Sequence, residues 1–350
     1  MQRGSSPRPI IEYITTSNDG VNWIKIGDMP HFGRIVTFTE EKITKEGAKK
    51  SRPVKKGDLI LSNSMSYGLP YIMGIDGYIH DGWFVLKDFE NTFDKDYLCN
   101  LLISSAIQNQ YKRLAAGGVV QNISSDLVNS VSVSIPTMTE QKKISSLLNL
   151  IDERIATQNK IIDKLQTLIK GLRNDVFGKL RKSVGFNAMI SDVLSYEQPQ
   201  SYIVEDTEYT NEGTPVLTAN KAFVLGYTSE IDGIYDKGDC ILFDDFTLDC
   251  KYVDFPFKVK SSAIKILTAE NKELLRYTFE FLKYLDLSTD EHKRHYITET
   301  QNLGFILPTK QIVRTISHVF SALSLQMETI VKQKNALEKQ KQYLLRQMFI

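Results

Sequence analysis

The fold is decided by residues 136–177, which read PTMTEQKKISSLLNLIDERIATQNKIIDKLQTLIKGLRNDVF. Apolar residues recur there at alternating spacings of four and three, interrupted at Gln158: Ile144, Leu148, Ile151, Ile155, Ile162, Leu165, Ile169, Leu172 and Val176. Such spacing places them on one narrow stripe of an α-helix, as in a coiled-coil seam. The stretch therefore predicts a long helix that needs a partner.

The same pattern returns near the end of the chain, in residues 308–349. Its apolar positions are Ile316, Phe320, Leu323, Met327, Ile330, Leu337, Leu344 and Met348, and Lys334 and Lys341 interrupt them. The two stretches align without a gap, from Pro136 with Pro308 to Phe177 with Phe349. A spacing of domain size indicates a duplicated domain rather than a solenoid.

Each helix is expected to be roughly 35 residues and about 50 Å long. Thr137 and Glu140 suit a capping box at the start of the first helix. Matching length and register favour antiparallel pairing of the two helices within one chain. The alternatives are that each helix packs on its own domain or pairs between chains.

The composition is that of a globular protein with more than one domain. The chain has 350 residues, of which 42% are hydrophobic and 24% charged. Three cysteines provide no even disulfide framework, which indicates a reducing compartment. No apolar run approaches the length of about 18 residues that spans a membrane, and no secretory signal follows Met1.

The net charge of +1 argues neither for nor against nucleic acid. A basic run stands against one acid, Glu46: Lys42, Lys45, Lys49, Lys50, Arg52, Lys55 and Lys56. Such a run is more often a solvated face than a track for phosphates, and both interpretations stay open.

The residues before the first long helix predict a mixed α/β head. Strands are expected at Trp23–Ile26, Leu59–Leu61 and Val131–Ile135, and a helix at Tyr97–Leu114. The residues after Gly178–Gly185, which is expected to be a basic turn, repeat this head in weaker form. The clearest matches are Lys237-Gly238-Asp239 with Lys56-Gly57-Asp58, the helix Leu274–Leu285 with Tyr97–Leu114, and Gln301-Asn302 with Gln121-Asn122.

Motifs for catalysis are missing. The sequence has no Gly-x4-Gly-Lys-Ser/Thr loop for phosphates, and no two prolines are adjacent, which excludes the Asn/Asp-Pro-Pro-Tyr/Phe motif of amino-methyltransferases. Asp28 with Glu40 and Lys42 imitates a nuclease set only loosely. Cys240, Cys250, His292 and His295 have a poor spacing for zinc.

Polar clusters at expected loops of both heads are candidates for DNA contacts, because amides, hydroxyls and basic groups read base edges and phosphates. Ordinary turns use the same residues. The candidates are Ser62, Asn63, Ser64, Tyr67, His80, Trp83, Lys112, Arg113, Gln121 and Asn122 in the first head, and Asn220, Lys221, Lys258, Lys260, Ser261, His292, Lys293, Arg294, Gln301 and Asn302 in the second.

Several motifs, taken in order, carry a resemblance to a known family. The long helix has Pro136-x3-Glu140-Gln141-x2-Ile144, and its copy has Ile312-Val313 in place of the Glu-Gln pair. The heads contribute Arg3–Pro7, Trp23–Asp28, Lys56–Ser62, His80–Trp83, Leu217–Asn220, Gly238–Asp245, Ser261–Ala263 and His292–Arg294. Together these segments resemble the specificity subunit of Type I restriction-modification systems over nearly the whole chain.

The resemblance implies an α/β (α+β) fold with two globular target-recognition domains separated by two long antiparallel coiled-coil helices. The expected boundaries are 1–136 for the first target-recognition domain, 137–182 for the central conserved helix, 183–308 for the second domain and 309–350 for the distal helix. The first domain has no counterpart of Phe186–Leu194, so its opening is expected to be shorter than that of the family.

The resemblance also implies a function in DNA methylation and phage defence. The chain would bind a bipartite double-stranded DNA site, one half per head, in the cytoplasm, with no catalysis and no membrane contact. Two modification subunits using S-adenosylmethionine, and restriction subunits using ATP and Mg, would assemble on it, and the chain would bind no cofactor or metal itself. The alternative is an adaptor with two peptide- or carbohydrate-binding heads on a helical rod.

Overall fold

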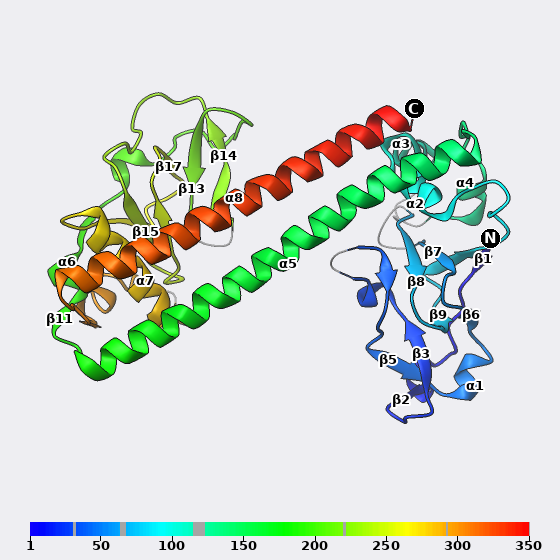
Figure 1. Cartoon of the computed structure of the whole chain (residues 1–350), viewed down its shortest axis with the longest axis horizontal. Coiled ribbons are helices and arrows are strands. Elements are labelled where there is room, and N and C mark those ends of the chain that lie inside the picture. The colour runs from blue at the N-terminus through cyan, green and yellow to red at the C-terminus, as the bar shows by residue number, and fades with distance from the viewer. Residues whose placement is uncertain (31–32, 64–67, 115–122, 220–221, 292, 350) are drawn as a thin grey trace. The chain divides into compact units, whose positions relative to one another are not determined.

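The computed structural model describes residues 1–30, 33–63, 68–114, 123–219, 222–291 and 293–349. The chain divides into two compact units. Unit 1 comprises Met1–Lys160 and Val331–Ile350, and unit 2 comprises Ile161–Ile330. Two long helices, α5 (Met138–Ser183) and α8 (Lys310–Met348), are divided between the units, so each helix contributes one segment to unit 1 and another to unit 2 (Figure 1).

Unit 1 contains short strands that the structure bounds as β1 Gln2–Arg3, β2 Ile14–Thr15, β3 Val21–Ile24, β4 Ile35–Val36, β5 Glu41–Ile43, β6 Arg52–Val54, β7 Leu59–Ser62, β8 Pro70–Met73, β9 Gly77–Ile79 and β10 Trp83–Leu86. They form one sheet in the order β1-β10-β7-β8-β4 and another in the order β2-β5-β3-β9-β6.

Unit 2 has strands bounded as β11 Ala188–Met189, β12 Ser195–Glu197, β13 Thr214–Leu217, β14 Val224–Thr228, β15 Cys240–Asp244, β16 Cys250–Val253, β17 Lys258–Val259, β18 Ile264–Thr268 and β19 Gly304–Phe305. The sheets have the orders β12-β18-β15-β16, β14-β13-β17 and β11-β19. The shorter helices of the chain are α1 Lys45–Ala48, α2 Lys95–Ile103, α3 Ser105–Leu114, α4 Ser125–Asn129, α6 Ile190–Val193 and α7 Lys272–Leu285.

The two units repeat one pattern of strand pairing. In unit 1, β7 pairs antiparallel with β8 and β10, and β3 pairs parallel with β9. In unit 2, β15 pairs antiparallel with β16 and β18, and β13 pairs parallel with β17. The equivalent strands follow one another in the same chain order. The duplication of the heads that the sequence predicts is thus confirmed in their pairing.

The predicted turns before β7 and β15 are also equivalent. Gly57 has a φ of 94° and Gly238 a φ of 102°. Both values lie in a region that side chains other than glycine rarely adopt. Glycine at the same place in both heads is therefore a requirement of the turn that starts the central strand.

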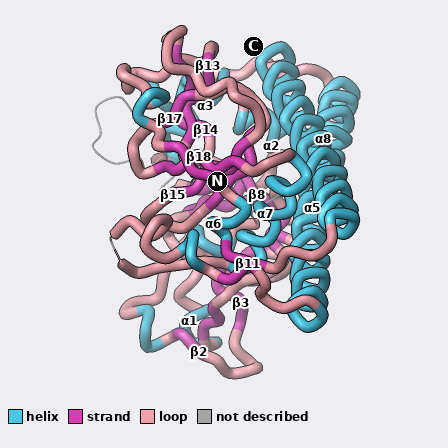
Figure 2. The backbone as a smooth tube through the Cα atoms, turned by 90° about the vertical axis from the view of Figure 1, so that its left-hand side faces the viewer, coloured by secondary structure: helices cyan, strands magenta, loops and turns pink. Residues whose placement is uncertain are grey.

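Segments of α5 and α8 pair antiparallel within each unit, as the seam predicts. In unit 1, Gln158 lies 3.4 Å from Gln333 and Asp152 forms an ion pair with Lys341, so residue numbers rise along one helix as they fall along the other. In unit 2, the Arg173 guanidinium lies 5.8 Å from the Phe320 ring centroid. Figure 2 also shows the two helices side by side.

The helices are longer than the sequence predicts. α5 has 46 residues and α8 has 39. Thr137 and Glu140 form the predicted capping box, since each backbone N–H donates to the other's side chain, at 2.9 and 3.4 Å. The expected turn at Gly178–Gly185 is wrong, because α5 continues to Ser183, and Gly185, with a φ of 74°, follows its end.

Two further expectations need correction. The helix expected at Tyr97–Leu114 is interrupted at Ser104, whose extended backbone (ψ 152°) ends α2 while its hydroxyl accepts from the N–H of Ile107. The strand expected at Val131–Ile135 is absent, and the Gln110 amide instead bonds both the N–H and the C=O of Ser132. In both places a side chain satisfies backbone groups that regular structure would otherwise pair.

The phenylalanine that directly follows each seam packs into the core of its unit. Phe177 is fully buried, and its ring centroid lies 5.3 Å from that of Tyr277 on α7. Phe349 lies 5.2 Å from Tyr97 on α2, the equivalent helix of unit 1. The heads are thus attached to the helix pair through equivalent aromatic contacts.

The Glu140-Gln141 pair is explained by local geometry. Gln141 is buried, and its amide accepts from the N–H of Asp94 at 2.8 Å while donating to the C=O of Thr92 at 2.9 Å. It therefore holds the start of α5 against the loop before α2. The described helices include none that is long and apolar enough to cross a membrane.

Candidate nucleic-acid interface

Parallel strands bring the polar loops of each unit to one edge of a sheet. The carboxyl ends of β13 and β17 are neighbours, since the N–H of Lys260 donates to the C=O of Leu217 at 3.1 Å. The end of β15 meets the start of β18, because Asp244 is in register with Ile264. Carboxyl ends of parallel strands are common places for ligand contacts.

In unit 2 this edge carries Arg294. The Arg294 side chain is exposed, lies 6.0 Å from the ring centroid of Phe246 and donates to the Ser262 hydroxyl at 3.2 Å. Ser261 is half-buried and Lys260 exposed in the adjoining turn. Three loops, which follow β15, β17 and α7, therefore contribute to one polar surface.

A buried ion pair fixes the backbone of the loop that carries Arg294. Asp245 and Lys265 are each 1% exposed and lie 3.2 Å apart. The Asp245 carboxylate also accepts from the N–H groups of His295 at 3.0 Å and Tyr296 at 2.7 Å, and Lys265 donates to Gln198 at 3.0 Å. The loop that carries Arg294 is thus anchored at the two residues that follow it.

The other predicted residues of this loop make local bonds. Lys293 forms ion pairs with Glu291 at 2.6 Å and Glu299 at 2.7 Å, and these bonds raise the pKa of Lys293. The side-chain amides of Gln301 and Asn302 donate to the C=O of Ile297, at 2.8 and 3.5 Å. These contacts stabilise the turn.

In unit 1 the equivalent edge is organised around Asp81. The side chain of Asn63, just after β7, donates to the Asp81 C=O at 2.9 Å. The Asp81 carboxylate accepts from the Ser6 hydroxyl at 2.7 Å and pairs with Arg8, 80% exposed, at 3.2 Å. Loops after β7 and β9 and the N-terminal segment therefore meet at this edge.

His80 lies beside Asp81 and is neutral near pH 7. Burial lowers the pKa of its imidazole below 6.5, against the opposing effect of Asp81. Its Nδ1 accepts from the Gly82 N–H at 2.7 Å, so the neutral ring carries its proton on Nε2. His80 can therefore donate one hydrogen bond to an acceptor.

Lys112 and Arg113 lie exposed in the last turn of α3. The basic run that precedes β7 is largely ion-paired or bonded locally: Lys45 lies 3.6 Å from Asp19 and Lys55 lies 3.1 Å from Asp76. These pairs favour the solvated-face interpretation of the run over a phosphate track.

Four predicted contact residues are buried, and the expectation is corrected for them: Trp83, Ser62, Lys258 and Asn63, which is 3% exposed with its side-chain N–H bound to the C=O of Asp81. Trp83 is 0% exposed in the core of unit 1, and Ser62 is 2% exposed with its hydroxyl accepting from the Leu69 N–H. Lys258 is 4% exposed and forms an ion pair with Glu230 at 2.6 Å. Hydrophobic packing and pairing with partners distant in the sequence keep these side chains from the surface.

Seven predicted contact residues lie outside the described residues: Ser64, Tyr67, Gln121, Asn122, Asn220, Lys221 and His292. Five residues at the two edges were not among the candidates: Ser6, Arg8, Asp81, Phe246 and Ser262. Asp81 and Ser262 stood inside polar clusters of the sequence. Arg8 and Phe246 are recognised only by their contacts in the structure.

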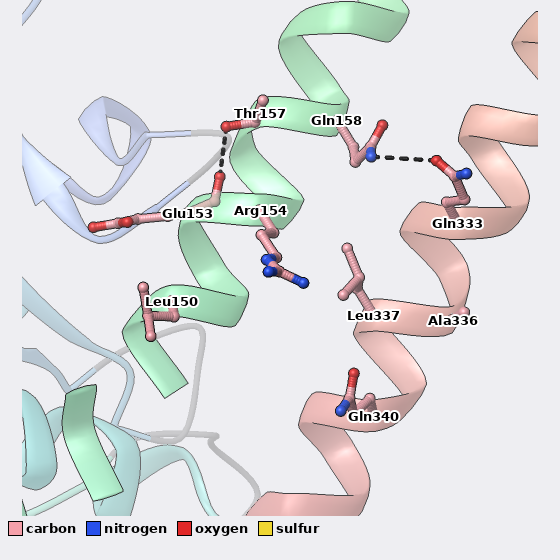
Figure 3. Close-up of a pocket in the computed structure, with 9 residues that line it drawn as sticks. All are labelled: Leu150, Glu153, Arg154, Thr157, Gln158, Gln333, Ala336, Leu337 and Gln340. Carbon is pink, nitrogen blue, oxygen red and sulfur yellow. Dashed lines mark hydrogen bonds between the residues drawn. The ribbon is translucent and has the colours of Figure 1, made fainter. Parts of the chain in front are cut away.

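The paired helices of unit 1 form a groove on their exposed side (Figure 3). Leu150, Ala336 and Leu337 supply apolar surface, and Glu153, Arg154 and Gln340 supply polar groups. Leu150 is 59% exposed.

Metal-binding chemistry is not assembled within the described ranges, where no three His, Cys, Asp or Glu residues are grouped to hold an ion. The three cysteine thiols are buried. Burial raises the pKa of Cys99 to about 11, of Cys240 to about 12 and of Cys250 to about 11. Such thiols are poor nucleophiles.

Comparison with known proteins shows similarity to one family over part of the chain. Residues 7–167 match the family model described as "Type I restriction modification DNA specificity domain". The Type I restriction enzyme EcoR124I/EcoR124II specificity subunit of Escherichia coli is 43% identical over 126 residues, which cover 34% of this chain and 31% of the relative. The HindI specificity subunit of Haemophilus influenzae is 27% identical over 159 residues, 44% of this chain and 34% of the relative.

These matches span about a third of the length of each curated relative. The fold is similar over the whole chain to the Type-I restriction-modification system S subunit from M. genitalium, with a TM-score of 0.61, 14% identity and coverage of 100% and 99% of the two chains. A second chain, from a study of assembly of a type I R-M system, has a TM-score of 0.55, 14% identity and coverage of 98% and 93%. The predicted resemblance and the mixed α/β fold class are confirmed.

Proposed function

We propose that this chain, in which residues 7–167 form a Type I restriction modification DNA specificity domain, is the sequence-reading subunit of a type I restriction-modification complex. The single observation that supports this most strongly is the equivalence of the two units. Both place exposed basic and polar side chains at the edge where β3–β9 or β13–β17 ends. Each unit would read one half of a bipartite DNA site.

His80, Arg8, Lys112 and Arg113 are the proposed contacts of unit 1. Lys260, Ser261 and Arg294 are those of unit 2. Exposed basic groups would position the duplex through its phosphates, and hydroxyl, imidazole and guanidinium groups would read base edges. The comparisons favour DNA recognition over the alternative of peptide- or carbohydrate-binding heads.

We further propose that modification subunits dock on the paired helices, where the groove beside Leu150 and Leu337 presents apolar surface. Catalysis would belong to these partners, with S-adenosylmethionine, and to restriction subunits, with ATP and Mg. The chain itself would bind no cofactor. Its role would be to choose the site.

Selection of DNA tests the proposal. The purified full chain is incubated with a pool of randomised duplexes, and the bound duplexes are sequenced after several rounds. Two conserved blocks separated by a gap of constant length are expected. The double variant Lys112→Ala/Arg113→Ala should weaken binding and leave the block read by unit 2 intact. Recovery of random sequence, with a correctly folded protein, would reject the proposal.

A further inference from the structure

We infer that Arg294 determines the identity of one base pair, a G·C pair, in the half-site of unit 2. The inference rests on the proposed function and deepens it, because it assigns one specificity-determining side chain. Three observations distinguish Arg294 from the other exposed basic residues of the same edge.

The first observation is that the Arg294 guanidinium is held in place. It lies against the Phe246 ring, with 6.0 Å from its central carbon to the ring centroid, and donates one hydrogen bond to Ser262 at 3.2 Å. Phe246 follows β15 and Ser262 precedes β18, so the two contacts come from adjacent strands of one sheet. A planar guanidinium fixed by a ring and a hydroxyl loses little further freedom on binding.

The second observation is that the backbone next to Arg294 is anchored by a buried charge. Asp245, 1% exposed, accepts from the N–H groups of His295 and Tyr296, and Lys265, also 1% exposed, neutralises it. The Asp245 N–H donates to the C=O of Ala263 at 2.8 Å, which joins this anchor to the turn that carries Ser262. Asp245 is therefore a positioning residue for Arg294.

The third observation is that Arg294 keeps several N–H donors available for a ligand, in contrast to its basic neighbours. Lys293 is held between two glutamates, and Lys260 presents a single flexible ammonium. Arg294 has several N–H donors, and within the described part of the chain one of them is given to Ser262. A fixed guanidinium with free parallel donors matches the O6 and N7 acceptors of guanine in the major groove.

The test uses the full chain and the duplex that selection with the wild-type protein has identified. Affinity is measured for this duplex, for duplexes in which each base pair of both half-sites is changed in turn, and for an unrelated duplex. Wild-type protein should lose roughly 5- to 150-fold in affinity when the G·C pair read by Arg294 is replaced.

Arg294→Ala should bind all four base pairs at that position about equally and leave every other position unchanged. Arg294→Lys keeps the charge and removes the planar fork, so it should weaken the preference while retaining affinity for the unrelated duplex. Arg314→Ala, a change of an exposed arginine on α8, is the matched control and should behave as wild type. Phe246→Leu should reduce the preference at the same base pair.

Two results would overturn the inference. One is an unchanged preference at every position in Arg294→Ala. The other is equal weakening for all duplexes, including the unrelated one, which would make Arg294 a phosphate contact. Both results can be obtained only if the wild-type protein binds one DNA sequence in preference to others. If the wild-type protein shows no such preference, the proposed function itself is rejected.

Discussion

The first prediction concerns Glu280 of α7, which joins the head of unit 2 to both long helices. Its carboxylate is 1% exposed and accepts from Arg173 of α5 at 2.7 Å and from Arg276 of α7 at 2.7 Å. Arg276 in turn donates to the C=O of Phe320 on α8 at 3.2 Å. The change Glu280→Gln preserves the shape of the side chain and removes the negative charge between two guanidinium groups.

The expected cost is large because two largely buried cations lose their counter-charge. Breaking a buried ion pair by removing one partner costs about 3–5 kcal/mol. For a unit of this size each kcal/mol lowers Tm by roughly 2–4 °C, so a decrease of roughly 6–20 °C is expected. The matched control is Glu273→Gln on the same helix, where the glutamate is 43% exposed and should contribute no more than about 0.5 kcal/mol.

The chain offers separate probes for the two units. Both tryptophans, Trp23 and Trp83, belong to unit 1, so tryptophan fluorescence follows unit 1 alone. Calorimetry records the unfolding of both units, and the thiol reactivity of Cys240 and Cys250 on heating follows unit 2. Glu280→Gln should lower the unfolding temperature of unit 2 by more than that of unit 1, which the tryptophan fluorescence reports.

The triple variant Arg173→Met/Arg276→Leu/Glu280→Leu should recover most of the stability that Glu280→Gln loses. The reason is that an apolar triad leaves no unpaired charge in the interior. A melting temperature of Glu280→Gln within about 2 °C of the wild type, or a shift no larger than that of the Glu273→Gln control, would show that the two arginines do not depend on the Glu280 charge.

Three further predictions address the helix pair, the thiols and the recognition loop. Leu148→Ala, at a fully buried seam position, should lower the free energy of unfolding of unit 1 by about 2–5 kcal/mol in chemical unfolding. Leu147→Ala, at a position that is 42% exposed, should change it by no more than about 0.5 kcal/mol. Equal effects of the two changes would mean that Leu148 is not part of the seam. Cys99, Cys240 and Cys250 should resist a thiol-specific reagent at pH 8 until the protein unfolds, because burial raises the pKa of each, and rapid labelling of the native chain would contradict this. The hydrogen bond to Glu299 raises the pKa of His295 above 6.5, so its stabilising effect is complete below about pH 6.5 and is lost as the pH rises through the higher folded-state pKa. Amide exchange at residues 295–302, corrected for the intrinsic rate, should therefore be more protected at pH 6 than at pH 8, and His295→Gln should remove the difference.

The parts of the fold that the sequence predicts are those encoded by local spacing. The apolar seam specifies long helices because each side chain needs only its position on the helix to reach a partner. Gly57 and Gly238 mark equivalent turns because the backbone there requires glycine whatever surrounds it. The duplication of the heads is also predicted from local sequence, because the seam and the glycine turn recur in the same order.

Features set by tertiary partners could not be predicted in this way. Lys258 looked like a DNA contact, but Glu230 lies close in space and neutralises it in the interior. Ser104 looked like a helical residue, yet its hydroxyl starts a second helix. Arg294 was among the candidates, while the contacts that single it out, with Phe246 and Ser262, come from segments far away in the sequence.

The proposed role in site selection is tested by methylation sequencing of the genome of a methylation-deficient host that expresses this chain with a type I modification subunit. The reference is a host that expresses the modification subunit alone. Adenine methylation is expected in one bipartite motif with a gap of constant length, and only when this chain is expressed. Methylation that is the same with and without this chain, or that follows an undivided motif, would show that this chain does not choose the sites.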